Sequence, residues 1–289
     1  MDNSYQIITD ATADLTPELL AGFDLKVIPM PVTLDGKTFH HYNDFREMPA
    51  KDFYDAVRAG KDASTAQINL LTYLRAFIPT LRAGKDLVYF CFSSGLSGTI
   101  QSANIVLAEL REKFPERKIL CIDTVCASLG QGFLLYHALL RQREGMSLDE
   151  LVAWAERDKR RASHWFTVED LNHLHKGGRL SKTAAVAGTM LQIKPILTVD
   201  AAGGLKVANK ARGTAKAYQF IVNHMKETAV HPAEQTVFIG HTDNPEGAEK
   251  LKSMVEGLVR QVVIQPIGPV IGAHTGAGMV ALVYWGGER

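Results

Sequence analysis

The stretch Ser93-Ser94-Gly95-Leu96-Ser97-Gly98-Thr99 places hydroxyl side chains and glycines between an apolar run and a predicted helix. Backbone N–H groups at the start of a helix favour a negative group, and glycines allow that group to approach closely. The hydroxyls add further hydrogen-bond donors, so this loop is suited to bind a carboxylate or a phosphate. The alternative is that these residues only cap the helix.

Two enzymatic interpretations of the same loop fit less well. A nucleotide P-loop requires Gly-Lys-Ser/Thr, and no lysine occurs between Lys85 and Lys113. The nucleophile elbow of a serine hydrolase requires Gly-x-Ser-x-Gly, and Gly95-Leu96-Ser97-Gly98 is one residue short of it. A hydrolase therefore stays as an alternative only.

Two basic segments could supply positive charge to such an anion site. Lys176-Gly177-Gly178-Arg179-Leu180-Ser181 combines a glycine pair, which permits an unusual backbone path, with an arginine whose rigid fork suits a carboxylate. Lys210-Ala211-Arg212 is the second segment. Taken singly, an arginine at a turn or a charged helix start is more often a solvated surface feature.

Glycines and a proline surround one histidine in the segment Gly268–Gly278, which predicts a shaped loop around His274. A histidine there can donate to an anion or act as an acid or base. The other close histidines, His173-x-His175 and His40-His41, lack carboxylate or cysteine partners, so no metal site is predicted.

Short apolar runs alternate with amphipathic segments along the whole chain, which is typical of an α/β protein. We expect strands at Tyr5–Thr9, Leu25–Leu34 with a hairpin turn at Asp35-Gly36, Leu87–Phe92, Lys118–Asp123, Trp165–Val168, Lys194–Val199, Leu205–Ala208, Gln235–Gly240, Gln261–Pro266 and Met279–Trp285. We expect helices from Thr16-Pro17 onward, at Lys51–Ala59, Leu70–Leu81, Thr99–Lys113, Gln131–Arg143, Ser147–Lys159, Thr214–Glu227 and Glu246–Leu258, and on both sides of Lys176–Arg179. The pattern predicts a Rossmann-like parallel-sheet domain over residues 1–165 and a second α/β domain over residues 166–289.

The bulk composition is that of an ordinary globular protein. Of the 289 residues 46% are hydrophobic and 22% charged, and 32 basic against 31 acidic residues leave a net charge of +1. Such a balanced charge does not favour binding to nucleic acid, so any anion-binding site must be confined to a few residues. The three cysteines are expected to be reduced, and neither a leader peptide nor a membrane span is apparent, so we expect a cytoplasmic protein.

In order along the chain, these segments resemble the DegV family, and the resemblance covers nearly the whole sequence. Thr9-Asp10-Ala11-Thr12-Ala13-Asp14-Leu15 is similar to the family's D-S-T-A-D-L, with alanine for the first serine. Thr65-Ala66-Gln67-Ile68-Asn69 keeps the threonine and glutamine of T-S-Q-P-S. Ser93–Ala103 matches S-S-G-L-S-G-T-Y-Q-S-A except for isoleucine at the tyrosine. Further blocks in register are Asp123-Thr124, Ser128–Gly132, Lys176–Ser181, Ile193–Leu197, Lys210–Arg212 and Ala273–Gly276.

The resemblance implies a two-domain DegV-type α/β fold with one long-chain fatty acid bound between the domains. It implies that the hydroxyls of Thr65 and Ser97 bind the carboxylate, that His274 lies beside it, and that the acyl chain fills an apolar tunnel. Arg179 and Arg212 match arginines that lie near the pocket mouth or face a kinase. No catalytic residue, metal ion or cofactor is implied for this chain.

The family also implies a role in phospholipid metabolism. Such proteins can serve as acyl-carrying subunits of a fatty acid kinase, whose separate ATP-binding subunit converts the presented carboxylate to an acyl phosphate. Two alternatives stay open at this point. One is a serine hydrolase that uses Ser97 and His274, and the other is a binder of another small anionic metabolite.

Overall fold

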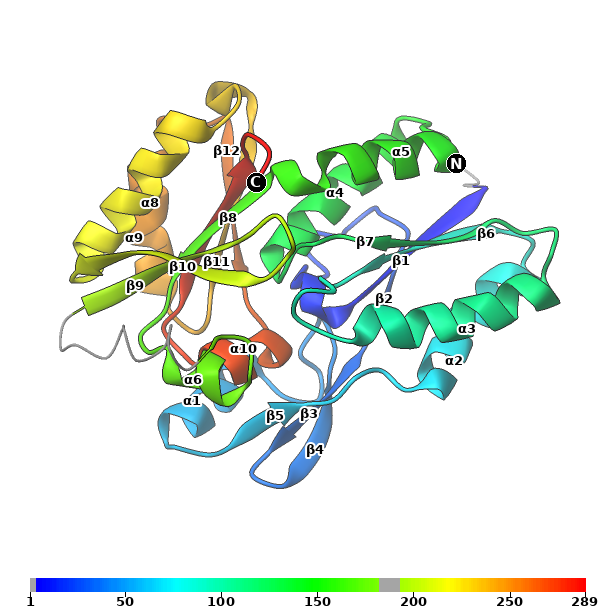
Figure 1. Ribbon diagram of the computed structural model, residues 1–289, viewed down its shortest axis with the longest axis horizontal. Coiled ribbons are helices and arrows are strands. Elements are labelled where there is room, and N and C mark those ends of the chain that lie inside the picture. The colour runs from blue at the N-terminus through cyan, green and yellow to red at the C-terminus, as the bar shows by residue number, and fades with distance from the viewer. Residues whose placement is uncertain (1–3, 182–192) are drawn as a thin grey trace.

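The computed structural model describes residues 4–181 and 193–289, which form two α/β bodies that lie side by side (Figure 1). The first body is built on a four-stranded sheet, the second on a six-stranded sheet, and a small three-stranded sheet lies below them. The predicted α/β class is confirmed.

The sheet of the first body is entirely parallel. Its order is β2-β1-β6-β7, formed by β1 (Tyr5–Asp10), β2 (Leu25–Ile28), β6 (Asp86–Cys91) and β7 (Ile119–Asp123). Helices α2 (Leu70–Arg82) and α3 (Thr99–Lys113) pack on one face, and α4 (Leu129–Arg143) and α5 (Leu148–Asp158) on the other. Strands buried on both faces read as continuous apolar runs, which explains why Leu87–Phe92 was recognisable from sequence. The Rossmann-like prediction for this half is confirmed.

The predicted extended run Leu25–Leu34 is divided between two sheets, so its prediction as one strand is wrong. It breaks after β2, and β3 (Met30–Leu34) pairs with β4 (Lys37–His41) and β5 (Ala63–Thr65) in a separate antiparallel sheet. The hairpin turn is confirmed, because Asp35 and Gly36 adopt φ of 52° and 77°, as a two-residue turn with left-handed backbone requires. Helix α1 (Ala50–Arg58) follows this hairpin.

Two further local predictions are wrong. No helix begins at Thr16, because the short 3-10 helix η1 (Ala11–Ala13) is followed by turns up to Gly22, whose φ of 83° ends any helical path. The segment around His274 is a helix, α10 (Pro269–Thr275), although a loop was predicted there. Its glycines serve packing, since a Cβ on Gly272 would lie 2.5 Å from the Tyr54 hydroxyl.

The second body is a mixed sheet of order β10-β9-β8-β13-β11-β12. Its strands are β8 (Ala162–Thr167), β9 (Ile193–Val199), β10 (Leu205–Arg212), β11 (Thr236–His241), β12 (Gln261–Pro266) and β13 (Val280–Trp285). Neighbouring strands are antiparallel except β11 and β12. The predicted boundary at residue 165 falls within β8.

Helices α8 (Thr214–Thr228) and α9 (Pro245–Val255) pack against this sheet, and α6 (Asn172–Lys176) lies beside α10. Two 3-10 turns, η2 (Lys159–Arg161) and η3 (Pro232–Glu234), precede β8 and β11. The helical stretch predicted after Arg179 lies outside the described residues.

Helix α4 joins the two bodies. Its buried side chains share one core with Ile7 and Phe90 of the parallel sheet and with Phe238 and Val283 of the mixed sheet. The approach is close, because a Cβ on Gly130 would lie 1.4 Å from Nε2 of His164, a buried residue of β8. Only glycine therefore fits at position 130.

Gly130→Ala should lower the free energy of unfolding by about 2–3 kcal/mol, the range for overpacking a core, because the buried ring of His164 cannot move aside. The matched control is Gly257→Ala, at a position where a Cβ would meet nothing within 4 Å. Urea unfolding of both variants measures the difference. Equal stability of Gly130→Ala and the parent would show that the junction is looser than described.

Candidate ligand-binding site

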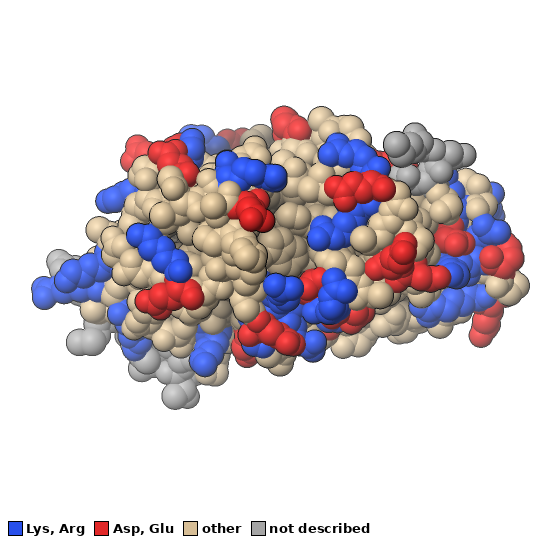
Figure 2. Space-filling model, turned by 90° about the horizontal axis from the view of Figure 1, so that it is seen from above, with Lys and Arg blue, Asp and Glu red and all other residues tan. Residues whose placement is uncertain are grey.

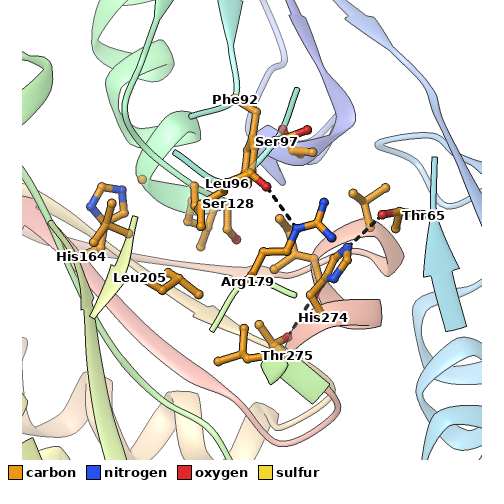
Figure 3. Close-up of a pocket in the computed structure, with 18 of the residues that line it drawn as sticks. Thr65, Phe92, Leu96, Ser97, Ser128, His164, Arg179, Leu205, His274 and Thr275 are labelled. Atoms are coloured by element: carbon orange, nitrogen blue, oxygen red, sulfur yellow. Dashed lines mark hydrogen bonds between the residues drawn. The ribbon is translucent and has the colours of Figure 1, made fainter. Parts of the chain in front are cut away.

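A cavity with about 980 Å³ of empty space lies where the two bodies meet, and Figure 3 shows its lining. The lining is mainly apolar, with a polar group of side chains at one end. The apolar residues include Met30, Phe92, Leu96, Leu129, Phe166, Leu174, Val199, Leu205, Val270, Ile271, Met279 and Val283.

Thr65 and His274 meet at the polar end of the cavity. Thr65 Oγ1 on β5 lies 2.8 Å from His274 Nε2 at the end of α10, although the residues are 209 positions apart. Burial, and then the nearby guanidinium of Arg179, lower the pKa of His274 to about 4. The ring is therefore neutral at pH 7, and its buried Nδ1 has no hydrogen-bond partner among the described residues. Gly177 makes room for this ring, since a Cβ there would lie 2.3 Å from Nδ1.

Ser97 reaches the same end of the cavity from the loop between β6 and α3. Its Oγ lies 2.8 Å from Thr99 Oγ1 and accepts the Thr99 N–H at 3.2 Å. Most amides of this loop already donate within the protein, those of Ser94, Gly95, Leu96, Ser97 and Thr99 among them. An anion here would therefore depend more on hydroxyls than on the backbone groups that the sequence suggested.

Arg179 brings the positive charge. Its Nε donates to the Leu96 carbonyl at 3.1 Å, and its Nη1 donates to the Gly177 carbonyl, so a partly buried guanidinium spans from one body to the loop of the other. Within residues 4–181 and 193–289 no carboxylate forms an ion pair with it. A desolvated cation that contacts only neutral acceptors favours an anionic ligand.

Arg212 differs from the other predicted residues. It lies exposed at the end of β10, opposite Ile193 of β9, and is not among the residues that line the cavity. The structure thus brings together Thr65, Ser97, Arg179 and His274, and leaves Arg212 apart from them. A role for Arg212 toward a partner stays a prediction.

The altered Thr65–Asn69 segment is explained by its surroundings. Ile68 is 2% exposed and packs in the core beneath α2. Asn69 caps α2, because its Oδ1 accepts the Thr72 N–H at 2.9 Å. Gln67 Oε1 accepts from Ser102 of α3 at 2.6 Å, which holds the segment against the Ser/Gly loop. The departures therefore keep Thr65 at the cavity.

Contacts between the bodies also run through the Ser/Gly loop. Ser93 Oγ donates to the Gly203 carbonyl in the β9–β10 turn at 2.8 Å. A Cβ on Gly95 would lie 2.7 Å from the Gly203 carbonyl carbon, so the two backbones touch. The hairpin turn of the second body thus closes over the cavity-lining loop of the first.

The buried carboxyl of Asp14 supports two cavity-lining segments at once. It accepts from Ser128 Oγ at 2.6 Å and from the Gly268 N–H at 2.9 Å, at the starts of α4 and α10. Desolvation by burial raises the pKa of Asp14 to about 8, against the two hydrogen bonds that lower it. The motif that contains Asp14 was noticed in the sequence without a role, and neither Asp14 nor Ser128 was predicted as a site residue.

The geometry does not assemble a serine nucleophile with its base. His274 Nε2 pairs with Thr65, Ser97 pairs with Thr99, and no carboxylate orients the imidazole among the described residues. The same residues contain no group of three or more His, Cys, Asp or Glu side chains that could hold a metal ion. No helix in the described ranges is long and apolar enough to cross a membrane.

An apolar cavity between two α/β bodies, closed at one end by hydroxyls, a neutral imidazole and a guanidinium, defines a binding protein for an amphipathic anion. The family described as "Uncharacterised protein, DegV family" matches residues 4–286. The chain is 39% identical to a DegV domain-containing protein of Clostridium perfringens over 99% of this chain and 98% of that one. It is 35% identical to one of Lactococcus lactis over 96% of each. The chain belongs to the DegV family.

Solved structures support the same fold. A DegV family protein of Thermus thermophilus, described by its fatty acid binding, has a TM-score of 0.87 at 29% identity over 98% of this chain and 99% of its own. A fatty acid binding DegV family protein of Streptococcus agalactiae has a TM-score of 0.84 at 29% identity over 98% of each chain. The predicted DegV-type fold is confirmed.

Asp14→Asn should change how stability depends on pH. Because burial raises the pKa of Asp14 in the folded state to about 8, well above the ordinary range of an aspartate, the folded state keeps a proton near neutral pH that the unfolded state has lost. This stabilisation is complete below about pH 4 and is lost as the pH rises through about 8. The free energy of unfolding of the parent should therefore fall, relative to Asp14→Asn, by more than about 1 kcal/mol between about pH 5 and pH 8. Urea titrations test this, with the exposed Asp52→Asn as control; parallel pH profiles for parent and Asp14→Asn would contradict it.

Proposed function

We propose that this protein binds one long-chain fatty acid in the cavity between its two units, residues 1–165 and 166–289. The observation that carries the proposal is Arg179, a partly buried cation at one end of an apolar cavity, without a carboxylate partner among the described residues. A fatty acid has a single carboxylate on an apolar chain, which matches a cavity that is polar at one end and apolar along the rest of its wall. The descriptions of the Thermus and Streptococcus relatives as fatty-acid-binding support the same ligand.

At the polar end of the cavity, the hydroxyl groups and the positive charge have different roles. Thr65 and Ser97 can each donate a hydroxyl hydrogen to the carboxylate, and Arg179 supplies the compensating charge. A neutral His274 keeps Thr65 in place and adds no second positive charge in a desolvated site. These are the groups that fix which end of the ligand enters.

The apolar end supplies the affinity. A sixteen-carbon acid has about fourteen CH₂ groups, and burial of each contributes about 0.8 kcal/mol, so full burial supplies roughly 11 kcal/mol before ordering costs. Each hydrogen bond to a charged group contributes about 1–3 kcal/mol, and these bonds mainly set the orientation of the ligand. An ester or a phosphorylated metabolite without an apolar chain would leave most of this cavity unfilled.

We further infer that the protein carries the acid and does not itself activate it. Its role would be to present the carboxylate to a separate ATP-binding kinase subunit, which forms the acyl phosphate used in phospholipid synthesis. The loop at the carboxylate end has no lysine for phosphates, and the described residues offer no carboxylate cluster for Mg²⁺. Arg212, exposed and outside the cavity, is suited to contact such a partner.

Protein expressed in bacteria should copurify with fatty acid, which extraction of the purified protein tests.

Thr65→Ala and Ser97→Ala should each weaken fatty acid binding by about 1–3 kcal/mol, because each removes a hydrogen bond to the carboxylate. Displacement of a fluorescent fatty acid after delipidation measures this. Ser64→Ala on the exposed side of β5 and Ser94→Ala in the same loop are matched controls. Extraction that yields no fatty acid would contradict the proposed ligand. Control variants that lose as much affinity as Thr65→Ala and Ser97→Ala would contradict the proposed carboxylate site.

The protein with fatty acid and Mg-ATP should form no acyl phosphate until a cognate kinase subunit is added. Alanine variants of Arg179, Arg212 and His274 should lose more in this coupled assay than in fatty acid binding, because the two arginines steady the charge of phosphoryl transfer or contact the partner, and the neutral His274 holds Thr65 in place at the presented carboxylate. Hydroxamate trapping detects the acyl phosphate. Acyl phosphate made by the protein alone would refute the carrier role, and full coupled activity in all three variants would refute their assignment.

A further inference from the structure

A second hollow, separate from the fatty acid cavity, lies where α4 and α5 meet the ends of β11, β12 and β13. It is open to solvent, and the space within it, part of which is open solvent, is about 750 Å³. Figure 2 looks down on this face of the molecule, where blue and red side chains surround a tan hollow. The lining includes the indoles of Trp154 and Trp285 and the side chains of His137, Arg141, Asp158, Arg161, Glu234, Gln235, Thr236 and Arg260. None of these residues lines the fatty acid cavity.

Arg141 is held in this hollow by an aromatic ring. Its Cζ lies 4.1 Å from the centroid of the Trp154 ring, and its Nη1 donates to the His137 carbonyl at 3.2 Å. Partial burial lowers the pKa of Arg141. Across residues 4–181 and 193–289 no carboxylate lies within ion-pair distance of it, although Glu144 and Asp158 act on its charge from further away.

Arg260 approaches the same hollow from the start of β12. Its Nη2 donates to the neutral Thr236 hydroxyl at 3.2 Å, and in the described part of the chain it too lacks an ion pair. The buried carboxylate of the lining, Asp158, is already taken, because it accepts from Arg157 at 2.7 Å and from Arg161 at 3.0 Å. Two guanidinium groups thus line a hollow in which neither forms an ion pair with a described carboxylate, although Asp158 and the exposed Glu234 line it as well.

His137 lines the same hollow and is neutral. Burial, and then Arg141 and Arg260, lower the pKa of His137 to about 3, so the ring carries no charge at pH 7. Its Nε2 is buried and has no hydrogen-bond partner among the described residues, so this atom does not open onto the hollow.

We propose that this hollow binds the phosphate group of a small phosphate monoester whose organic part contacts the indole of Trp285. Arginine forks match phosphate oxygens, and three acceptor oxygens can use both guanidinium groups at once. Trp285, a half-buried residue of the lining, offers an apolar surface beside the charge. The site does not depend on the fatty acid proposal.

Titration of the full chain with phenyl phosphate, followed by calorimetry and by tryptophan fluorescence, tests the site directly. Phenyl phosphate should bind with a 1:1 stoichiometry, and phenol alone should not. Arg141→Gln and Arg260→Gln should each weaken binding by about tenfold or more, as expected for loss of hydrogen bonds to a charged group. Arg143→Gln, an exposed arginine of α4 that lies over Phe23 outside the hollow, is the matched control and should bind as the parent does.

Fatty acid displacement on the same variants separates the two sites. Arg141→Gln and Arg260→Gln should bind fatty acid normally, and Thr65→Ala should bind phenyl phosphate normally. No saturable binding of phenyl phosphate, an equal loss in Arg143→Gln, or loss of phenyl phosphate binding in Thr65→Ala would each overturn the proposal. If Arg141→Gln fails to fold, the exposed Arg260→Gln still decides the outcome.

Discussion

The buried carboxyl of Asp14 is the interaction on which the arrangement of the cavity between the two bodies depends. It lies after β1, and it accepts hydrogen bonds from Ser128 and Gly268, the residues that immediately precede two helices distant in sequence. Ser128 needs this support, because its φ of 52° is an unusual backbone conformation for serine. Gly268 immediately precedes α10, the helix that carries His274 in its last turn. One side chain therefore fixes both the junction helix α4 and the imidazole at the polar end of the cavity.

The molecule separates the sources of ligand affinity from the sources of ligand orientation. In the cavity between the two bodies a largely apolar wall provides surface, and Thr65, Ser97, Arg179 and His274 give the polar end its character. Burial keeps His274 neutral, so the positive charge is concentrated on one guanidinium. The second hollow also combines arginines with a histidine, His137, that burial keeps neutral. At both places no described carboxylate forms an ion pair with Arg179, Arg141 or Arg260.

Much of the fold could be predicted from the sequence, because the sequence patterns that predict its helices and strands are local. Helix α3 was predicted with the bounds Thr99–Lys113 that the structure has, since a Ser/Gly loop and an apolar strand precede it. Helix α10 was missed because its glycines look like a loop, and they are there to let Tyr54 and neighbouring side chains approach. Strand β5 is three residues long and carries no periodicity, so the pairing of Thr65 with His274 is set by tertiary contacts alone. Roles for Thr65, Ser97 and His274 came from family resemblance, and nothing in the sequence pointed to Asp14 as a support.

Helix α4 has a consequence for how the chain can be divided. Phe133 in this helix packs edge-on against Phe238 of β11, with ring centroids 5.4 Å apart, and against Trp285 of β13 at 4.8 Å. A cut near residue 165 would leave this aromatic face of α4 in water and would strip β8 from the sheet to which it belongs. Each half would therefore expose apolar surface that the whole chain buries. Gene fragments or domain fusions based on this protein must therefore keep the chain whole across that point.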